Sequence, residues 1–314
     1  MALSPQAQAV VEQLERLAPA VDFTSLTPTE EVAYLRRVRT MPPRFAKQDV
    51  AEVSDIRIEG EIAARIYRPA SSKHDGGVIH YVHGGGWVLG TLDMHDGTCR
   101  ALANQTSCTV VATTYRLAPE HPFPAAAEDV FAALRWVAHS GRDCGWDSSK
   151  LVIAGSSAGG NLAASACLRA RDEGGPPIAL QVLIYPVLDS SQATRSYKDN
   201  ATGYFLTSQQ LAWYWDKYVP RAEDRRNPYA SPHHTPHLRN LPPTVIVTAE
   251  HDPLRDEGEA YGRRLIADGG RAVHYCAAGQ IHGFMTMLGL IDDADRFVRV
   301  IVDEIKQELG ITDV

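Results

Sequence analysis

Hydrophobic positions downstream of about residue 50 fall into short β-rich runs that alternate with longer helical patterns. The first two runs, residues 53–58 and 62–67, alternate apolar and polar side chains, as an antiparallel pair at a sheet edge does. The later runs are nearly continuous in Val, Ile and Leu, which is typical of parallel strands covered on both faces. We predict these later strands at residues 78–82, 109–115, 150–154, 179–185, 244–249 and 272–276.

Helical patterns separate these runs. Residues 125–141 form one such pattern, which Gly141 closes, and residues from 254 to about 268 form another, followed by two glycines. The alternation predicts an α/β fold with a mostly parallel sheet of eight strands and helices on both faces. Ligands of such folds bind at the carboxyl ends of the strands.

Two segments do not fit the alternation. Residues 1–45 hold two helical patterns, and residues 190–225 contain an aromatic helical pattern between the sixth and seventh strands. We predict an N-terminal helical cap at residues 1–45 and an α/β core at residues 46–314, with residues 190–225 contributing to the cap. Both segments would cover the carboxyl edge of the sheet. The aromatic side chains Trp213, Tyr214 and Trp215 would line a pocket there or pack the cap, and the pattern leaves both open.

Composition narrows the function classes. The formal net charge is −7 and the sequence has no block of basic residues, which argues against binding to nucleic acid. No apolar stretch approaches the roughly 18 residues of a membrane span, and the first residues lack the features of a signal peptide. Five cysteines without a CxxC pair indicate reduced thiols. We therefore expect a cytoplasmic protein without a membrane span.

Two adjacent serines, Ser156 and Ser157, stand between a predicted strand and a predicted helix. A nucleophile on such a sharp turn needs a small residue two places before it and two places after it. Gly155 and Gly159 flank Ser157 in this way, whereas alanines flank Ser156. We predict Ser157 as the nucleophile, at a helix N-terminus that favours a developing oxyanion. The alternative is a turn of small residues in which the serines cap the helix.

A serine nucleophile needs a base, and the base needs a carboxylate to orient it. In this architecture the acid follows the seventh strand, where the sequence offers Glu250, Asp252, Asp256 and Glu257. Asp252 lies in the loop at the end of the strand, directly before Pro253. Proline suits the first position of a helix, so Asp252 would lie in the loop and Asp256 and Glu257 inside the helix. A plain helix cap at Asp252 is the alternative.

The base should follow the last strand, and His282 stands in the loop that we expect there, before Gly283. His274 lies within the predicted strand and His251 lies beside the acid, so both are worse placed. A lone loop histidine is usually only solvated. The predicted position after the last strand is what makes His282 the candidate.

Three consecutive glycines, residues 84–86, follow the predicted strand at residues 78–82. Glycine lets the backbone approach a substrate carbonyl closely and turn its N–H groups toward it. We therefore expect an oxyanion hole in this loop, with a flexible turn as the alternative.

Five motifs occur in an order that closely resembles the hormone-sensitive-lipase-like esterases, bacterial lipase family IV. The resemblance implies an α/β-hydrolase fold with an N-terminal helical cap and a triad of Ser157, Asp252 and His282. It also implies hydrolysis of short- to medium-chain carboxylic esters through an acyl-enzyme, without any cofactor or metal. The motifs are HGGGW (83–87), YRLAPEHPFPAA (115–126), GSSAGGNLA (155–163), DPLRDEG (252–258) and IHGF (281–284).

The resemblance also implies that the N–H groups of Gly85, Gly86 and Ala158 form the oxyanion hole, with Gly84 shaping the loop. Tyr115, Arg116 and Glu120 would brace that hole as a structural network. Members of the family often pair through an edge strand, so the resemblance also allows a homodimer. We expect substrate contacts from Trp87, Tyr204, Phe205 and Trp213.

Ser156 is a departure from the family, because many members have Asp before the nucleophile. This position is outside the triad, so we expect the catalytic chemistry to be retained. Without the Asp, the sequence leaves open how the neighbouring loops are held in place. His233, His234 and His237 carry no expectation of a metal site, because Pro232 and Pro236 break any helix that would align them.

Two other functions remain as alternatives. An amidase or peptidase of the same fold would use the same triad, but such peptidases often carry a large extra domain, for which 314 residues leave no room. A non-catalytic receptor for a small molecule is the other. The plant gibberellin receptors resemble this family but lack the catalytic histidine, whereas His282 is present here.

Overall fold

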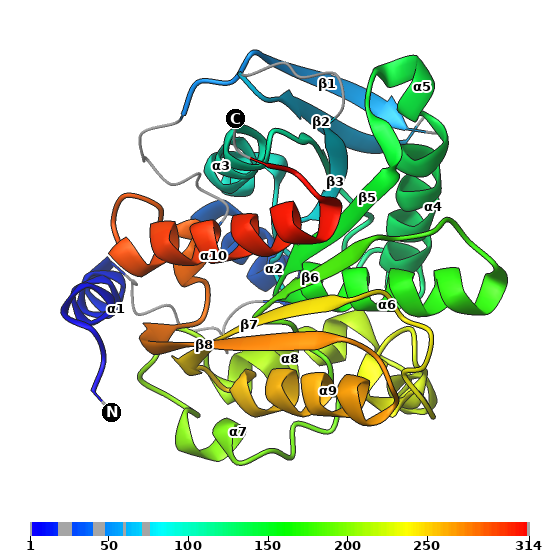
Figure 1. Cartoon of the computed structure of the whole chain (residues 1–314). Coiled ribbons are helices and arrows are strands. Elements are labelled where there is room, and N and C mark those ends of the chain that lie inside the picture. Colours follow the sequence, from blue (N-terminus) through cyan, green and yellow to red (C-terminus); the bar gives the residue numbers. More distant parts are fainter. Residues whose placement is uncertain (1, 18–26, 40–47, 59–60, 71–75, 313–314) are drawn as a thin grey trace.

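An eight-stranded sheet forms the centre of the computed structural model, which describes residues 2–17, 27–39, 48–58, 61–70 and 76–312 (Figure 1). The strand order is β1-β2-β4-β3-β5-β6-β7-β8. β1 and β2 are antiparallel to their neighbours, and all other neighbouring pairs are parallel. The strands are β1 (Glu52–Ile58), β2 (Ile62–Arg68), β3 (Gly77–Val82), β4 (Thr109–Thr113), β5 (Asp147–Ser156), β6 (Leu180–Ile184), β7 (Thr244–His251) and β8 (Ala272–Ile281).

Helices cover both faces of this sheet (Figure 1). α3 (Asp96–Thr106) and α10 (Asp292–Leu309) pack on one face, and α4 (Ala125–His139), α6 (Ala158–Glu173) and α9 (Arg255–Ala267) pack on the other. The remaining helices are α1 (Pro5–Leu17), α2 (Pro28–Arg39), α5 (Gly141–Cys144), α7 (Ser196–Asp199) and α8 (Ser208–Tyr218), with short 3₁₀ turns at η2 (Leu92–His95), η3 (Ala222–Arg226), η4 (Pro232–His234) and η5 (Phe284–Thr286).

The two faces explain the continuous apolar runs. In β3, Val78 and Val82 enter the core under α4 and α6, whereas Ile79 and Tyr81 enter the core under α3 and α10. All four side chains are almost completely buried. A strand between two helical layers has no face for polar side chains, and full burial of one large apolar side chain contributes about 1.5–3 kcal/mol.

All eight predicted strands are present, and the α/β-hydrolase architecture predicted from the motifs is confirmed. The strands that lead to the candidate site are longer than predicted. β7 continues to His251 and β8 continues to Ile281, and these two residues pair across an irregularity in the ladder. The side chains that follow the two strands are therefore held by the sheet itself.

The segments predicted to form the cap meet the core near the carboxyl ends of the strands. α2 contacts α8 through Trp213, whose Nε1 donates to Glu31 Oε2 over 3.0 Å. α1 lies beside β8, where the Ser4 N–H donates to the Gly279 carbonyl over 2.9 Å. The predicted boundary between cap and core at residues 45 and 46 falls outside the described residues.

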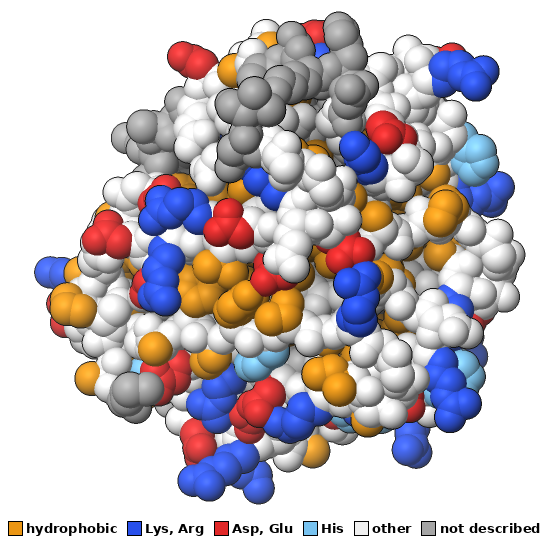
Figure 2. All heavy atoms as spheres, viewed as in Figure 1, with side chains coloured by type: hydrophobic (Ala, Val, Ile, Leu, Met, Phe, Trp, Pro, Cys, Tyr) orange, Lys and Arg blue, Asp and Glu red, His pale blue; other side chains and the backbone are white. Residues whose placement is uncertain are grey.

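Charged side chains of both signs are interspersed over the face of the molecule in Figure 2, where Lys and Arg stand among Asp and Glu. Within the described residues, no helix combines the length and apolarity that crossing a membrane requires.

Candidate active site

Ser157 lies at the sharp turn between β5 and α6, with φ 56° and ψ −120°. Two close backbone approaches surround it. A methyl group on Gly155 would overlap the carbonyl oxygen of Gly159, and one on Gly159 would overlap the carbonyl oxygen of Val82 at the end of β3. These contacts are the physical reason for a small residue on each side of Ser157.

Three side chains from distant parts of the chain meet at this turn. His282 Nε2 lies 2.9 Å from Ser157 Oγ, and His282 Nδ1 lies 2.7 Å from Asp252 Oδ2. Asp252 has no exposed surface and His282 is almost fully buried. The other carboxylate oxygen, Asp252 Oδ1, accepts a hydrogen bond from the N–H of Leu254 over 2.9 Å.

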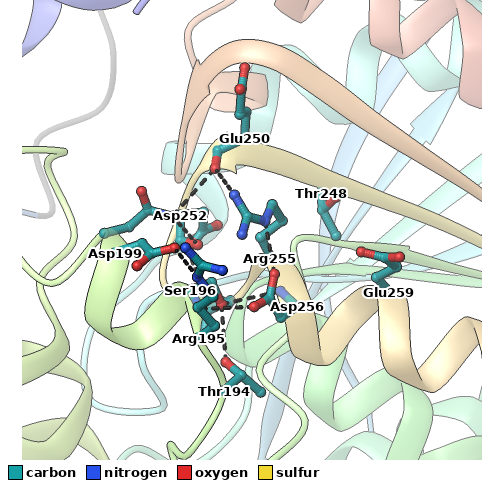
Figure 3. Close-up of polar contacts among 12 residues, drawn as sticks. Thr194, Arg195, Ser196, Asp199, Thr248, Glu250, Asp252, Arg255, Asp256 and Glu259 are labelled. Atoms are coloured by element: carbon teal, nitrogen blue, oxygen red, sulfur yellow. Dashed lines mark hydrogen bonds and ion pairs between the residues drawn. The ribbon is translucent and has the colours of Figure 1, made fainter. Parts of the chain in front are cut away.

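The loop that carries Asp252 is fixed from the side by α7. Asn200 Nδ2 donates to the Asp252 carbonyl over 3.1 Å. The Ser196 N–H donates to Asp256 Oδ2 over 2.8 Å, while the Asp256 N–H donates back to Ser196 Oγ over 3.2 Å (Figure 3). The N-terminus of α7 and the N-terminus of α9, which follows Asp252, are therefore joined by two hydrogen bonds.

The other candidate acids have different partners. Glu250 Oε2 accepts from the N–H of Gly279 over 2.7 Å, and Asp256 is engaged by Ser196. Glu257 is fully buried and accepts from the N–H of Leu188 over 2.6 Å. Burial raises the pKa of the Glu257 carboxyl well above its usual range, which disfavours the ionised form that would orient a base.

The other candidate bases also point elsewhere. His274 Nε2 lies 2.8 Å from Thr248 Oγ1, on neighbouring strands. The His251 ring stacks on Tyr204 with centroids 4.8 Å apart. Of the three histidines considered from the sequence, only His282 contacts Ser157.

The glycine loop after β3 has the backbone conformation that the sequence led us to expect. Gly85 has φ 125° and Gly86 has φ 60°, values that favour glycine. Ala158 is the first residue of α6, where backbone N–H groups have no partner within the helix. Over the described part of the chain, no protein acceptor faces the N–H groups of Gly85, Gly86 or Ala158.

The motif at residues 115–126 supports this loop in part. Tyr115 stacks on the His83 ring with centroids 4.4 Å apart, and its hydroxyl donates to the His83 carbonyl over 3.1 Å. Arg116 instead binds Asp129 in α4, with Nη2 and Oδ1 2.6 Å apart. Glu120 pairs with Arg36 of α2 at 2.8 Å.

Arg36 also reaches the two loops that flank the site. Its Nε donates to the Val88 carbonyl and its Nη2 donates to the Ala118 carbonyl, each over 3.0 Å. α2 is thereby fastened to the loops after β3 and after β4. No sequence motif distinguishes Arg36 from the other charged residues of its helix.

Trp87, which we expected to contact substrate, is instead part of the packing. It has no exposed surface, and it stacks on Tyr218 with centroids 4.3 Å apart and an interplanar angle of 8°. Trp215 packs against it as well, with centroids 4.7 Å apart. No surface of Trp87 remains for a substrate, because the aromatic face of α8 covers it.

The other expected substrate contacts have different positions. Phe205 lies beside the base, because a methyl group on Gly283 would stand 3.4 Å from the Phe205 ring. Tyr204 stacks on His251, and Trp213 is tied to Glu31. Of these three, only Phe205 borders a residue next to His282.

Two further aromatic residues lie at the site, of which only Tyr214 was among the candidates from the sequence. The Tyr214 ring packs directly on Gly86, since a methyl group there would overlap it. Tyr185, with φ 35°, follows β6 and places its ring 4.7 Å from the imidazole of His282. The positive φ of Tyr185 has no signature in the sequence, whereas Tyr214 was only one of three adjacent aromatic candidates.

The histidines at residues 233–237 take part in local contacts. His234 Nε2 lies 3.5 Å from Asp189 Oδ1. Among the side chains that the structure describes, no three of His, Cys, Asp or Glu are gathered as a metal ion would need.

Comparisons with known proteins identify the family of this chain. A family model for the alpha/beta hydrolase fold matches residues 79–286. The esterase LipI of Mycobacterium tuberculosis is 41% identical over 269 residues, which cover 83% of each chain. The carboxylesterase NlhH of the same organism is 38% identical over 271 residues, covering 84% of this chain and 85% of that protein.

A solved structure gives the same result for the fold. The alpha/beta hydrolase enzyme LAE6 from the metagenome of Lake Arreo in Spain superposes with a TM-score of 0.89 at 33% identity, over 98% of this chain and 99% of that one. The chain therefore belongs to the alpha/beta-hydrolase family that its motifs indicated, and it is a carboxylic ester hydrolase.

Proposed function

We propose that this hydrolase is a serine carboxylesterase that cleaves short- to medium-chain carboxylic esters through an acyl-enzyme. The observation that carries the proposal is the continuous chain of contacts from Asp252 Oδ2 through the imidazole of His282 to Ser157 Oγ, at 2.7 and 2.9 Å. A carboxylate oxygen only accepts, so Nδ1 carries the imidazole proton and Nε2 is free to take one from the serine.

In the first half of the reaction, Ser157 Oγ attacks the carbonyl carbon of the ester while His282 Nε2 takes the hydroxyl proton. The carbonyl oxygen becomes an oxyanion. The N–H groups of Gly85, Gly86 and Ala158 would hold it, because they face no protein acceptor and because Ala158 opens a helix. The carbon–oxygen bond to the alcohol then breaks, and the alcohol leaves with the proton from Nε2.

In the second half, water replaces the alcohol. His282 Nε2 takes a proton from this water, whose oxygen attacks the acyl carbon. When the tetrahedral intermediate collapses, the bond to Ser157 Oγ breaks and the proton returns to Oγ. The carboxylic acid leaves, and Asp252 keeps the same imidazole tautomer throughout.

The preference for short and medium chains rests on two aromatic rings. Tyr214 packs on Gly86 at the oxyanion loop, and Phe205 lies beside Gly283 next to the base. These rings limit the room beside the serine. LipI and NlhH, the relatives named esterase and carboxylesterase, support an ester substrate.

A series of p-nitrophenyl esters from acetate to palmitate tests the substrate class. We expect kcat/KM to be highest among the short and medium acyl chains and to fall steeply toward palmitate. A preference for palmitate would contradict the proposed class. The same assay with an aminoacyl p-nitroanilide and its matched ester decides between an esterase and an amidase, and we expect hydrolysis of the ester alone.

A further inference from the structure

His95, at the end of the turn η2, contacts the loop that we assign to the oxyanion hole. The N–H of Gly84 donates to His95 Nε2 over 3.2 Å. The bond turns this N–H toward the protein interior. The N–H groups of Gly85 and Gly86, in the peptide groups that follow, donate to no protein acceptor in the described part of the chain. His95 is thus placed to set the orientation of the loop at its first glycine.

The hydrogen bond fixes the tautomer of His95. A backbone N–H only donates, so Nε2 must be unprotonated. His95 is 3% exposed, and burial lowers its pKa to about 3, which keeps the ring neutral at pH 7. The one remaining proton is on Nδ1, which lies 3.2 Å from the Tyr81 hydroxyl. Tyr81 of β3 accepts from Nδ1, so the imidazole is held at both nitrogens.

The remaining polar groups at the start of the loop have side-chain partners as well. Tyr115 donates to the His83 carbonyl, and His83 Nδ1 lies 2.8 Å from the Gly84 carbonyl. The His83 ring also lies between the rings of Tyr115 and His95, with centroids 4.4 and 6.2 Å away. Among the three side chains that bind the start of the loop, His95 supplies an acceptor, and Tyr115 and His83 supply donors.

We propose that His95, in its neutral Nδ1–H form, is a positioning residue of the oxyanion loop. By accepting from the Gly84 N–H it holds the peptide planes that aim Gly85 and Gly86 at the carbonyl oxygen of the ester. It touches no substrate and acts through the loop. The inference rests on the proposed function, since it needs an oxyanion that forms at this loop.

Two substitutions separate the hydrogen bond from packing. In His95→Gln, the amide oxygen reaches about as far as Nε2 and is able to accept from Gly84, whereas His95→Leu offers no acceptor. We expect His95→Leu to lower kcat about 10- to 100-fold with KM within about twofold, because only transition-state stabilisation is lost. His95→Gln should recover most of kcat.

A transition-state analogue provides a second readout. A trifluoromethyl ketone adds to the serine and forms an oxyanion, whereas the alcohol product does not. We expect His95→Leu to weaken inhibition by the ketone by the same factor as kcat and to leave inhibition by the alcohol unchanged. A residue that only supports the fold would change the thermal midpoint and neither of these ratios.

His80 offers the matched control. It is a second fully buried histidine on the same segment of chain, and its Nε2 contacts Thr113 Oγ1 at 2.8 Å, away from the loop. His80→Leu should lower stability and leave kcat and ketone inhibition near wild type. If His95→Leu does not fold, His95→Asn replaces it, because the shorter amide does not reach Gly84.

Wild-type kcat and ketone inhibition in folded His95→Leu would overturn the inference. It would also be overturned if His95→Gln lost as much kcat as His95→Leu, since shape and not the acceptor would then matter. Failure of the proposed function has a different signature, because the wild-type enzyme itself would then not be inhibited by the ketone.

Discussion

His282 Nδ1 lies 2.7 Å from Asp252 Oδ2, at the end of a carboxylate that is completely buried and also accepts from the N–H of Leu254. The carboxylate holds the imidazole in the tautomer that leaves Nε2 open toward Ser157. The two residues follow neighbouring parallel strands, β7 and β8. Their geometry is therefore built by the sheet and not by a mobile loop.

Asp252→Asn tests this contact. The amide would allow the imidazole proton to move to Nε2, where it blocks removal of the serine proton, so we expect kcat to fall by about 10³- to 10⁴-fold. KM should change little. Asp256→Asn, the same change four residues later in the first turn of α9, should retain kcat within about tenfold. Equal losses in the two variants would mean that loop structure, and not the tautomer, accounts for the effect.

The adjacent serines are expected to behave oppositely. Ser156 is almost fully buried and lies outside the proposed triad, so Ser156→Ala should keep most activity. Ser157→Ala removes the proposed nucleophile, and kcat on p-nitrophenyl butyrate should fall by at least about 10³-fold. Steady-state kinetics of the two variants give the comparison, and a reversed order would refute the assignment.

Gly159 should not tolerate a side chain. A methyl group there would overlap the Val82 carbonyl at the end of β3, so Gly159→Ala should destabilise the fold by about 2 kcal/mol or more. Gly97 in α3 is the control, since Leu288 Cδ1 would stand at an ordinary contact distance of 3.7 Å from the new methyl group. Gly97→Ala should be neutral or stabilising by up to about 1 kcal/mol. Urea unfolding measures both, and a neutral Gly159→Ala would contradict the close approach.

Buried histidines make stability dependent on pH. Burial lowers the pKa of His80 from 6.5 to about 3. Below pH 6.5 the unfolded chain binds a proton that the folded state refuses, so stability is complete above pH 6.5 and falls as the pH drops toward 3. The loss is about 1.4 kcal/mol per pH unit for one such histidine.

The variant His80→Gln should remove the contribution of His80 to the pH dependence of stability. Between pH 7.5 and pH 5, we expect the variant to lose about 2 kcal/mol less stability than wild type, as measured by urea unfolding at both values. His139→Gln, at an exposed position, should leave the difference unchanged. An identical loss in His80→Gln and wild type would show that His80 is not neutral in the folded state.

Arg36 provides a test of the connection between α2 and the site. Its contacts to the Val88 and Ala118 carbonyls hold loops that flank the proposed oxyanion hole, so Arg36→Ala should lower kcat severalfold and stability by about 1 kcal/mol. Arg36→Lys should not restore kcat, because one ammonium group cannot replace the planar guanidinium, whose Nε and Nη2 donate to two different carbonyls. Arg37→Ala, at the exposed neighbouring position, serves as the control in the same assays.

The fold and the three candidate catalytic side chains could be predicted from the sequence because they follow local rules. Apolar runs without alternation require two helical layers, and the glycines around Ser157 reflect close backbone approaches. Asp252 and His282 follow predicted strands, so the topology brings them to the same edge. The extension of β8 to Ile281 was missed, because Ala277, Ala278 and Gly279 have low strand propensity. Pairing of Ala277 with Ala249 and of Ile281 with His251 continues the strand through them.

Residues that depend on tertiary packing could not be predicted. Trp87 follows the glycine loop directly, as a pocket residue would, but α8 covers it completely. Which face of α8 meets Gly86 depends on the angle at which this helix crosses the loop, so Tyr214 was not distinguished from its neighbours. His95 stands eleven residues after Gly84 in a segment without a motif, and only the turn η2 brings it back to the loop.

Covalent labelling tests the central claim most directly. A fluorophosphonate reacts with a serine that a histidine activates, and the mass of the intact protein and of its peptides locates the adduct. We predict one adduct per chain on Ser157, with loss of esterase activity in parallel and no adduct on the Ser157→Ala variant. Full hydrolysis of p-nitrophenyl butyrate by a chain without any adduct at Ser157 would contradict the account.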